Sequence, residues 1–269
     1  MTDIQKATTV RGLLSTENVK AKFQEILKDK AAGFTANLAV MVSNSAALSN
    51  CEPLSIISAA VVSASLDLPL DPNLGFAYVI PYGAKAQFQI GYKGLIQLAQ
   101  RSGQYKTINV SEVYDGELVS QNRMTGDYEF DESCRKSDKV IGYSAYFRLL
   151  NGFEKTVYMP VEQIDKHGKR FSQTYKKGFG LWKDDFDSMA KKTVLKHLIS
   201  KWGILSIEMQ SAVKFDQSVI RDVETGEVEY IDNEQDNTPI QLDPEKADPL
   251  KAKKTTDTDQ PKPENGKLI

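Results

Sequence analysis

Two kinds of signature are scarce or absent in this chain of 269 residues: paired cysteines and nucleotide-binding motifs. Cys51 and Cys134 lie far apart and neither belongs to a CxxC pair, so the sequence favours reduced thiols over a disulfide framework or a zinc site. Neither GxxxxGK followed by Ser or Thr nor GxGxxG occurs, which excludes the standard ATP and dinucleotide sites. We therefore expect a protein that works without a cofactor.

Long apolar runs are also missing. No stretch of about 18 apolar residues is present, and the first ten residues lack the apolar segment of a secretory signal. These absences argue against a membrane span and predict residence in the cytoplasm. Hydrophobic residues still make up 41% of the chain, enough to bury a core.

Charge is unevenly distributed along the chain. Residues 1–216 carry 27 basic and 23 acidic side chains, whereas residues 217–269 carry 7 and 13. Within the first part, residues 166–201 hold ten basic side chains against three acidic ones. Such a local excess is typical of a surface that binds a polyanion.

The last part of the sequence, residues 216–269, is predicted to be a disordered acidic tail. It is rich in Asp, Glu, Pro, Lys and Thr, and after Ile231 it offers almost nothing to bury. It could act as a solubilising linker, bind a partner, or compete with nucleic acid for the basic surface. Residues 1–215 then form the candidate DNA-binding and annealing domain.

The first seventy residues are predicted to be largely helical, in segments 15–31, 34–44 and 53–68. In the first segment, Val19, Phe23, Ile26 and Leu27 form a single apolar stripe after a Ser-Thr cap. Such a stripe needs a partner surface. Two readings stay open: an oligomerisation arm that contacts another subunit, or packing within the chain.

From Gly75 the hydrophobic period changes to two, which predicts antiparallel hairpins. Residues 75–81 and 84–91 flank a turn, with Lys85, Gln87 and Gln89 expected on one solvated strand face. A second hairpin is predicted at 139–150 and 153–160, joined by an Asn-Gly pair.

The remaining segments alternate between strands, loops and helices. A helix is predicted up to a left-handed stop at Gly103, then a strand at 105–114 and a polar loop or ribbon at 115–138. A short helix at 161–171, a basic loop at 172–182, a long helix at 184–203 and a last helix at 206–213 follow. Without βαβ alternation, this order predicts an α+β fold in which helices flank an antiparallel hairpin sheet.

The Gly-Tyr-Lys-Gly turn at residues 91–94 follows a strand and opens a helix. Free N–H groups at a helix N-terminus can bind an anion, and Tyr92 beside Lys93 would suit a base and its phosphate. The alternative is that Gly91 and Gly94 only permit a tight strand-to-helix turn.

The long helix at 184–203 is the other basic element. Lys192, Lys196 and Ser200 share one stripe, Lys191 points elsewhere, and Trp202 is expected on the core side with neighbouring leucines. A solvated lysine face would explain the stripe. The preceding loop favours a single-strand binding surface instead, because cations and aromatics interleave in it.

Acids and histidines give little support to catalysis. Asp184, Asp185 and Asp187 could hold Mg²⁺ for phosphodiester cleavage, but acids in a first helical turn also cap the helix, which accounts for them without a metal. His167 and His197 have no partner at ligand spacing. We predict structural or surface roles for both.

Three blocks of the sequence carry a family resemblance. LPLDPNLGFAYVIPYG, QIGYKGLIQLAQRSGQ and DSMAKKTVLKHLISKWGILS resemble the signature blocks of the RecT family of phage and prophage recombinases. The likeness spans about residues 54–213. It implies an annealing core like those of Rad52 and Red beta, pairing of complementary DNA strands without ATP, and no catalytic site.

The resemblance also implies partners. These are single-stranded DNA and the annealed duplex, further copies of the chain in a ring or helical filament, a 5′→3′ exonuclease, a host single-strand binding protein, and no membrane. The cell would be a bacterial host. A passive single-strand shield and a Mg²⁺-dependent nuclease stay open as alternatives.

The candidate DNA-binding residues are polar, cationic or aromatic and come from the segments above. They are Lys85, Gln87, Gln89, Tyr92, Lys93, Arg101, Lys176, Lys177, Trp182, Lys191, Lys192, Lys196 and Lys201.

Overall fold

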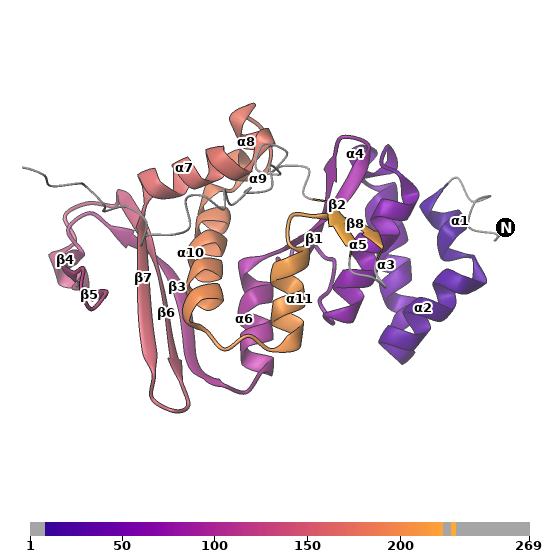
Figure 1. Ribbon diagram of the computed structural model, residues 1–269. Helices are drawn as coiled ribbons and strands as arrows, with labels where there is room; N and C mark the ends of the chain where they lie inside the picture. The colour runs from indigo at the N-terminus through magenta and orange to yellow at the C-terminus, as the bar shows by residue number, and fades with distance from the viewer. Residues whose placement is uncertain (1–8, 223–226, 230–269) are drawn as a thin grey trace, which may run out of the picture. The chain divides into compact units, whose positions relative to one another are not determined.

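Helices fill the N-terminal part of the chain in the computed structural model, which describes residues 9–222 and 227–229 (Figure 1). The predicted tail from residue 230 onward lies outside the described residues. The N-terminal helices are α1 (Val10–Leu14), α2 (Glu17–Leu27), η2 (Lys28–Lys30), α3 (Ala31–Ser43), α4 (Ala46–Ser49) and α5 (Pro53–Ser65).

The apolar stripe of α2 is used within the chain. Phe23 is fully buried and its ring lies 5.7 Å from that of Phe34 on α3, while Ile26 packs against the same core. Helix α5 is buried on almost all sides, as its uniformly apolar sequence predicts. The stripe therefore packs within the chain, and an oligomerisation arm within residues 1–70 stays a prediction.

The first hairpin pairs β1 (Ala77–Tyr82) with β2 (Lys85–Ile90) in antiparallel register. The prediction of a solvated face on β2 is wrong, because Gln87 and Gln89 are both buried. Helix α5 covers one side, where Ser55 accepts a hydrogen bond from the Ala86 N–H at 2.8 Å. On the other side the Gln89 amide donates to the sulfur of Met189 at 3.6 Å. Alternation of amide and apolar side chains along a strand therefore does not require that one face of the strand is exposed to solvent.

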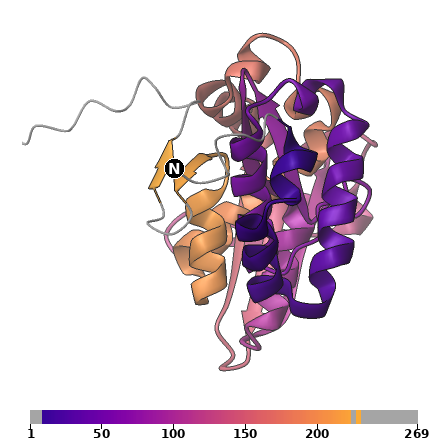
Figure 2. The same ribbon diagram turned by 90° about the vertical axis from the view of Figure 1, so that its right-hand side faces the viewer.

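Helix α6 (Tyr92–Arg101) ends before Gly103, whose φ of 66° confirms the predicted left-handed stop. The chain then forms a three-stranded antiparallel sheet from β3 (Tyr105–Tyr114), β6 (Val140–Leu149) and β7 (Glu154–Pro160), with β6 in the centre. Alternate residues of β6, such as Tyr143 and Phe147, are buried beneath α7 (Val161–Phe171) and α10 (Phe186–Trp202). Figure 1 shows α7 and α10 beside this sheet, and in the turned view of Figure 2 the N-terminal helices face the viewer.

The polar segment between β3 and β6 is a ribbon, one of its two predicted forms. It comprises β4 (Leu118–Asn122), β5 (Asp127–Phe130) and η3 (Glu132–Cys134). The ribbon lies beside β7, where the Lys155 ammonium donates to the carbonyls of Thr125 and Gly126 at 2.9 and 3.1 Å.

Short helices replace part of the predicted basic loop. α8 (Gln173–Lys176) and α9 (Leu181–Asp184) precede α10, and α11 (Ile207–Phe215) follows it. The strands β8 (Val219–Asp222) and β9 (Glu227–Glu229) then pair with each other. The α+β class with antiparallel sheets is confirmed, and the likeness of the core to those of Rad52 and Red beta stays a prediction.

The prediction that the disordered tail starts at residue 216 is wrong for the first residues of that segment. Asp216 and Ser218 are buried, and the Gln217 N–H donates to the Phe88 carbonyl of β2 at 2.9 Å. The segment is held because Ser218 also bridges to Phe88 and β8 lies against α5. Residues 216–222 belong to the folded body.

Candidate nucleic-acid interface

Helix α10 distributes its lysines over different surroundings. Its apolar residues, Val194 and Leu198 among them, are fully buried. Lys191 forms an ion pair with Glu112 of β3 at 2.6 Å, which confirms that it points away from Lys192. Because both members of this pair are largely covered, Lys191 is less available to a phosphate than predicted.

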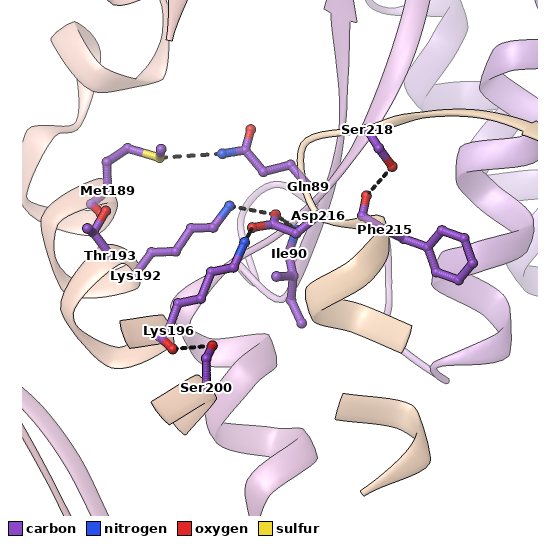
Figure 3. A network of polar contacts seen from close by, with 10 residues as sticks. All are labelled: Gln89, Ile90, Met189, Lys192, Thr193, Lys196, Ser200, Phe215, Asp216 and Ser218. Atoms are coloured by element: carbon purple, nitrogen blue, oxygen red, sulfur yellow. Dashed lines mark hydrogen bonds and ion pairs between the residues drawn. The ribbon is translucent and has the colours of Figure 1, made fainter. Parts of the chain in front are cut away.

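Lys192 and Lys196 share one buried carboxylate. Asp216 accepts from the Lys192 ammonium at 2.7 Å on one oxygen and from Lys196 at 2.6 Å on the other, and the Ile90 N–H donates to it at 3.1 Å (Figure 3). The Lys192 side chain is 5% exposed and that of Lys196 is 28% exposed. Lys192 is therefore an interior residue, and the prediction of an open phosphate contact there is wrong.

Burial governs the protonation of this network. Burial lowers the pKa of Lys192 to about 8, despite the opposing attraction of Asp216. Burial alone would raise the pKa of Asp216, but the charges of Lys192 and Lys196 hold it below its usual value. Two cations and one anion thus lie together, with Lys192 and Asp216 buried and Lys196 partly exposed.

A cavity of about 390 Å³ opens beside the network, between α7, α10 and the segment after α11. Its lining combines lysines, histidines, aromatic rings and one acid, namely Met159, His167, Phe171, Trp182, Met189, Lys192, Thr193, Lys196, His197, Ser200, Val213, Asp216 and Gln217. The predicted stripe of Lys192, Lys196 and Ser200 forms one wall of it. The structure therefore brings both histidines, which the sequence left without a partner, to the same cavity.

Exposed cations lie at the N-terminal end of α10. Lys176 and Lys177 are exposed at the end of α8, together with the apolar ring of Phe179. Trp182, predicted as a DNA contact, is buried and stacks on Tyr175 with ring centroids 5.5 Å apart. Its face is already used within the protein, so it forms part of the wall of the cavity and not of the outer surface.

At the other end of α10 a second aromatic residue is open to solvent. Trp202 is 41% exposed, contrary to the prediction that it faces the core, because it is the last residue of α10. The ammonium groups of Lys201 and Lys155 lie 5.4 and 5.3 Å from its ring centroid. Sequence reasoning missed Lys155 because it comes from the distant strand β7.

The glycines of the Gly-Tyr-Lys-Gly turn serve close packing. A Cβ atom at Gly91 would overlap the Gly75 carbonyl, and one at Gly94 would overlap the Phe76 carbonyl. The Gly91 N–H donates to Phe76 at 2.9 Å and is not free for an anion. The tight-turn reading therefore accounts for both glycines, while Lys93 remains exposed beside a half-buried Tyr92.

Two more predicted DNA contacts are less available than expected, because one side chain bonds to the protein backbone and the other is partly buried. The Arg101 guanidinium donates to the carbonyls of Leu66 and Asp67, both at 2.7 Å, and so closes the C-terminal end of α5. Lys85 is half-buried at the start of β2. Arg101 has a structural role that the sequence pattern did not indicate.

Two of the three acids around the start of α10 have separate structural partners. Asp185 caps the helix by accepting from the Ser188 N–H at 3.1 Å, as predicted, whereas Asp187 accepts from the Tyr143 hydroxyl. Burial and this hydrogen bond raise the pKa of Tyr143. Among residues 9–222 and 227–229, no group of three or more acids, histidines and cysteines is placed to hold a metal ion, and no helix is long and apolar enough to cross a bilayer.

Comparison with known proteins identifies the family. The RecT family model matches residues 32–238. This chain belongs to the RecT family. It is 51% identical over 236 residues to the uncharacterized protein YqaK of Bacillus subtilis (strain 168), covering 88% of this chain and 80% of that protein. It is 30% identical over 209 residues to protein RecT of Escherichia coli (strain K12), covering 71% and 75%. The family resemblance is confirmed, and membership of this family supports a recombination-related annealing protein.

Proposed function

We propose that this RecT-family chain is a single-strand annealing protein that binds single-stranded DNA and pairs complementary strands in homologous recombination without ATP. The family match over residues 32–238 carries the proposal. The match includes both hairpins of the predicted sheet, α10 and Asp216, and so covers the whole candidate interface. Neither catalysis nor a cofactor is part of this function.

The arrangement around α10 supports a path for the strand. Lys176 and Lys177 lie at one end of the helix, the cavity with Lys196 lies along it, and Lys201 with Trp202 lies at the other end. The 17 residues of α10 span about 26 Å, so one strand lying along the helix would contact all three places. Lysines would hold phosphates and Trp202 would stack on a base, which leaves other base edges free to test a second strand.

The partners of this activity are part of the same proposal. We infer that several copies act together as a ring or filament on DNA, that a 5′→3′ exonuclease supplies the single strands, and that a host single-strand binding protein is displaced. The cytoplasm of a bacterial cell is the proposed location. Lys93 and Lys85, close to β2 and α6, are further candidate DNA contacts.

An annealing assay tests the proposal. Two complementary oligonucleotides, one with a fluorophore and one with a quencher, are mixed with the full chain, with and without ATP and with and without Mg²⁺. We expect duplex formation to be faster with protein and independent of ATP. Binding without acceleration would indicate a passive shield, and shortened strands in Mg²⁺ would indicate a nuclease; either result overturns the proposal.

A further inference from the structure

Both histidines of the chain line the cavity beside α10. The sequence contains two histidines in all, His167 on α7 and His197 on α10, separated by thirty positions. The ring of His167 lies 4.7 Å from that of Phe171, and its charge interacts with those of His197 and Lys196. The side chains with an ordinary pKa near neutrality are therefore gathered in one place.

The charges in this cavity do not balance. Lys192 and Lys196 each carry an ammonium group, whereas Asp216 is the single acid among the described residues that line the cavity. Both Asp216 oxygens are occupied, by two lysines and the Ile90 N–H. An ammonium has three donors, and within the described residues each lysine nitrogen has Asp216 as its acceptor. One positive charge is left over in a largely buried site.

The groups around the histidines are also cationic. Lys196, His197 and Arg170 act on His167, and Lys201 acts on His197. Burial, followed by these charges, lowers the pKa of both imidazoles below the ordinary value. Near pH 7 most of these histidine side chains are therefore neutral, and the excess positive charge in the cavity comes from the lysines.

We propose that the cavity is a single-phosphate subsite, in which Lys196 and the two histidines bind one phosphodiester of the DNA strand while Asp216 retains Lys192. A phosphodiester carries one negative charge and would balance the excess cation. The volume of about 390 Å³ admits a phosphate with part of its sugar, and Phe171 and Trp182 provide apolar walls. The inference rests on the proposed function, because the phosphate belongs to a bound strand.

The proposal couples DNA binding to protonation. A phosphodiester next to an imidazole favours the protonated form, so each histidine that gains a proton on binding strengthens binding as the pH falls. We expect the affinity for oligo-dT to rise about tenfold between pH 7.5 and 5.5 at constant ionic strength. Uptake of one proton on binding changes the affinity about tenfold per pH unit, so this rise corresponds to an average uptake of about half a proton across the two units. Oligo-dT is chosen because thymine does not titrate in this range.

Nuclear magnetic resonance tests this on the unmodified full chain. The two histidines should give two Cε1–H signals, one for each ring, whose movement with pH reports each pKa. We expect oligo-dT to raise both pKa values by about 1 pH unit or more. Inorganic phosphate is the second probe: a rise with oligo-dT alone indicates a subsite that requires the strand, and a rise with both indicates one that also admits the free ion. Unchanged pKa values in the bound complex would overturn the proposal.

Variants give an independent readout. The double variant His167→Gln and His197→Gln keeps polar side chains but should lose the pH dependence of oligo-dT binding, while Lys196→Met should weaken binding at every pH. If the double variant keeps the dependence of the unmodified chain, the subsite is wrong although annealing stands. If the unmodified chain binds no single-stranded DNA at any pH, the proposed function itself fails.

Discussion

Lys192 and Lys196 of α10 lie against a buried carboxylate, whereas Lys176 and Lys177 at the end of α8 are exposed to solvent. A sequence shows both pairs as basic residues near aromatic ones. The buried pair has fixed partners, and salt screens its charges little. The exposed pair attracts a phosphate through water, and physiological salt screens that attraction beyond a distance of about 8 Å. The first pair is therefore held in place by the fold, whereas the second is open to solvent, where we propose that it attracts the strand.

The largest expected effect comes from removing the buried carboxylate. Asp216→Asn leaves two largely buried ammonium groups without their anion, and we expect the free energy of unfolding to fall by about 3–5 kcal/mol. Urea denaturation at pH 7 measures it. Asp138→Asn is the matched control, because that carboxylate is 97% exposed and its loss should change stability by about 0.5 kcal/mol or less.

The pH dependence of this effect has a definite sign. The folded-state pKa of Asp216 is lowered, so its carboxylate stabilises the fold above the unfolded value of about 3.9 and that contribution is lost as the pH falls further. The difference between the unmodified chain and Asp216→Asn should therefore narrow below about pH 4. A constant difference down to pH 2 would show that the carboxylate acts through packing instead of charge.

The next effect concerns the exposed end of α10. Trp202→Ala should weaken single-stranded DNA binding by about 1–3 kcal/mol, because a base loses its stacking surface. Fluorescence anisotropy of a labelled oligonucleotide measures the affinity. Ile207→Ala, which removes an apolar side chain that is 79% exposed, is the control. Equal losses in both variants would argue against stacking on Trp202.

The smallest effect should come from the exposed lysines. Replacing Lys176 and Lys177 together by Ala should lower the salt slope of single-strand binding by about 1.4, or about 0.7 for each lost phosphate contact. Stability should change by about 0.5 kcal/mol or less. Lys20→Ala, on the exposed side of α2, should leave the slope unchanged. An unaltered slope in the double variant would place the DNA path elsewhere.

Much of the fold follows from local patterns in the sequence. The helical start, the Asn-Gly hairpin, the stop at Gly103 and the long basic helix depend on short-range periodicity and turn chemistry, which the sequence displays directly. The buried state of Gln89 could not be predicted in this way, because it contacts Met189 of α10, one hundred residues further along the chain.

The candidate site was harder to predict for the same reason. Helical periodicity places Lys192 and Lys196 on one stripe, but it does not reveal their partner Asp216, which lies beyond α11 in the segment predicted as tail. Arg101 and Lys191 looked available because their partners, the end of α5 and Glu112, are remote in sequence. A cation is free or engaged according to tertiary neighbours that local spacing does not contain.

The position of Asp216 decides where the chain can be shortened. A fragment that stops at Phe215, the end of α11, would lose the carboxylate and the Gln217 and Ser218 contacts to β2. A fragment ending after Asp222 would retain them. A core fragment for crystallisation should therefore end downstream of β8. A fragment with an earlier boundary would be destabilised by the loss of these contacts, and its instability would say nothing about the full chain.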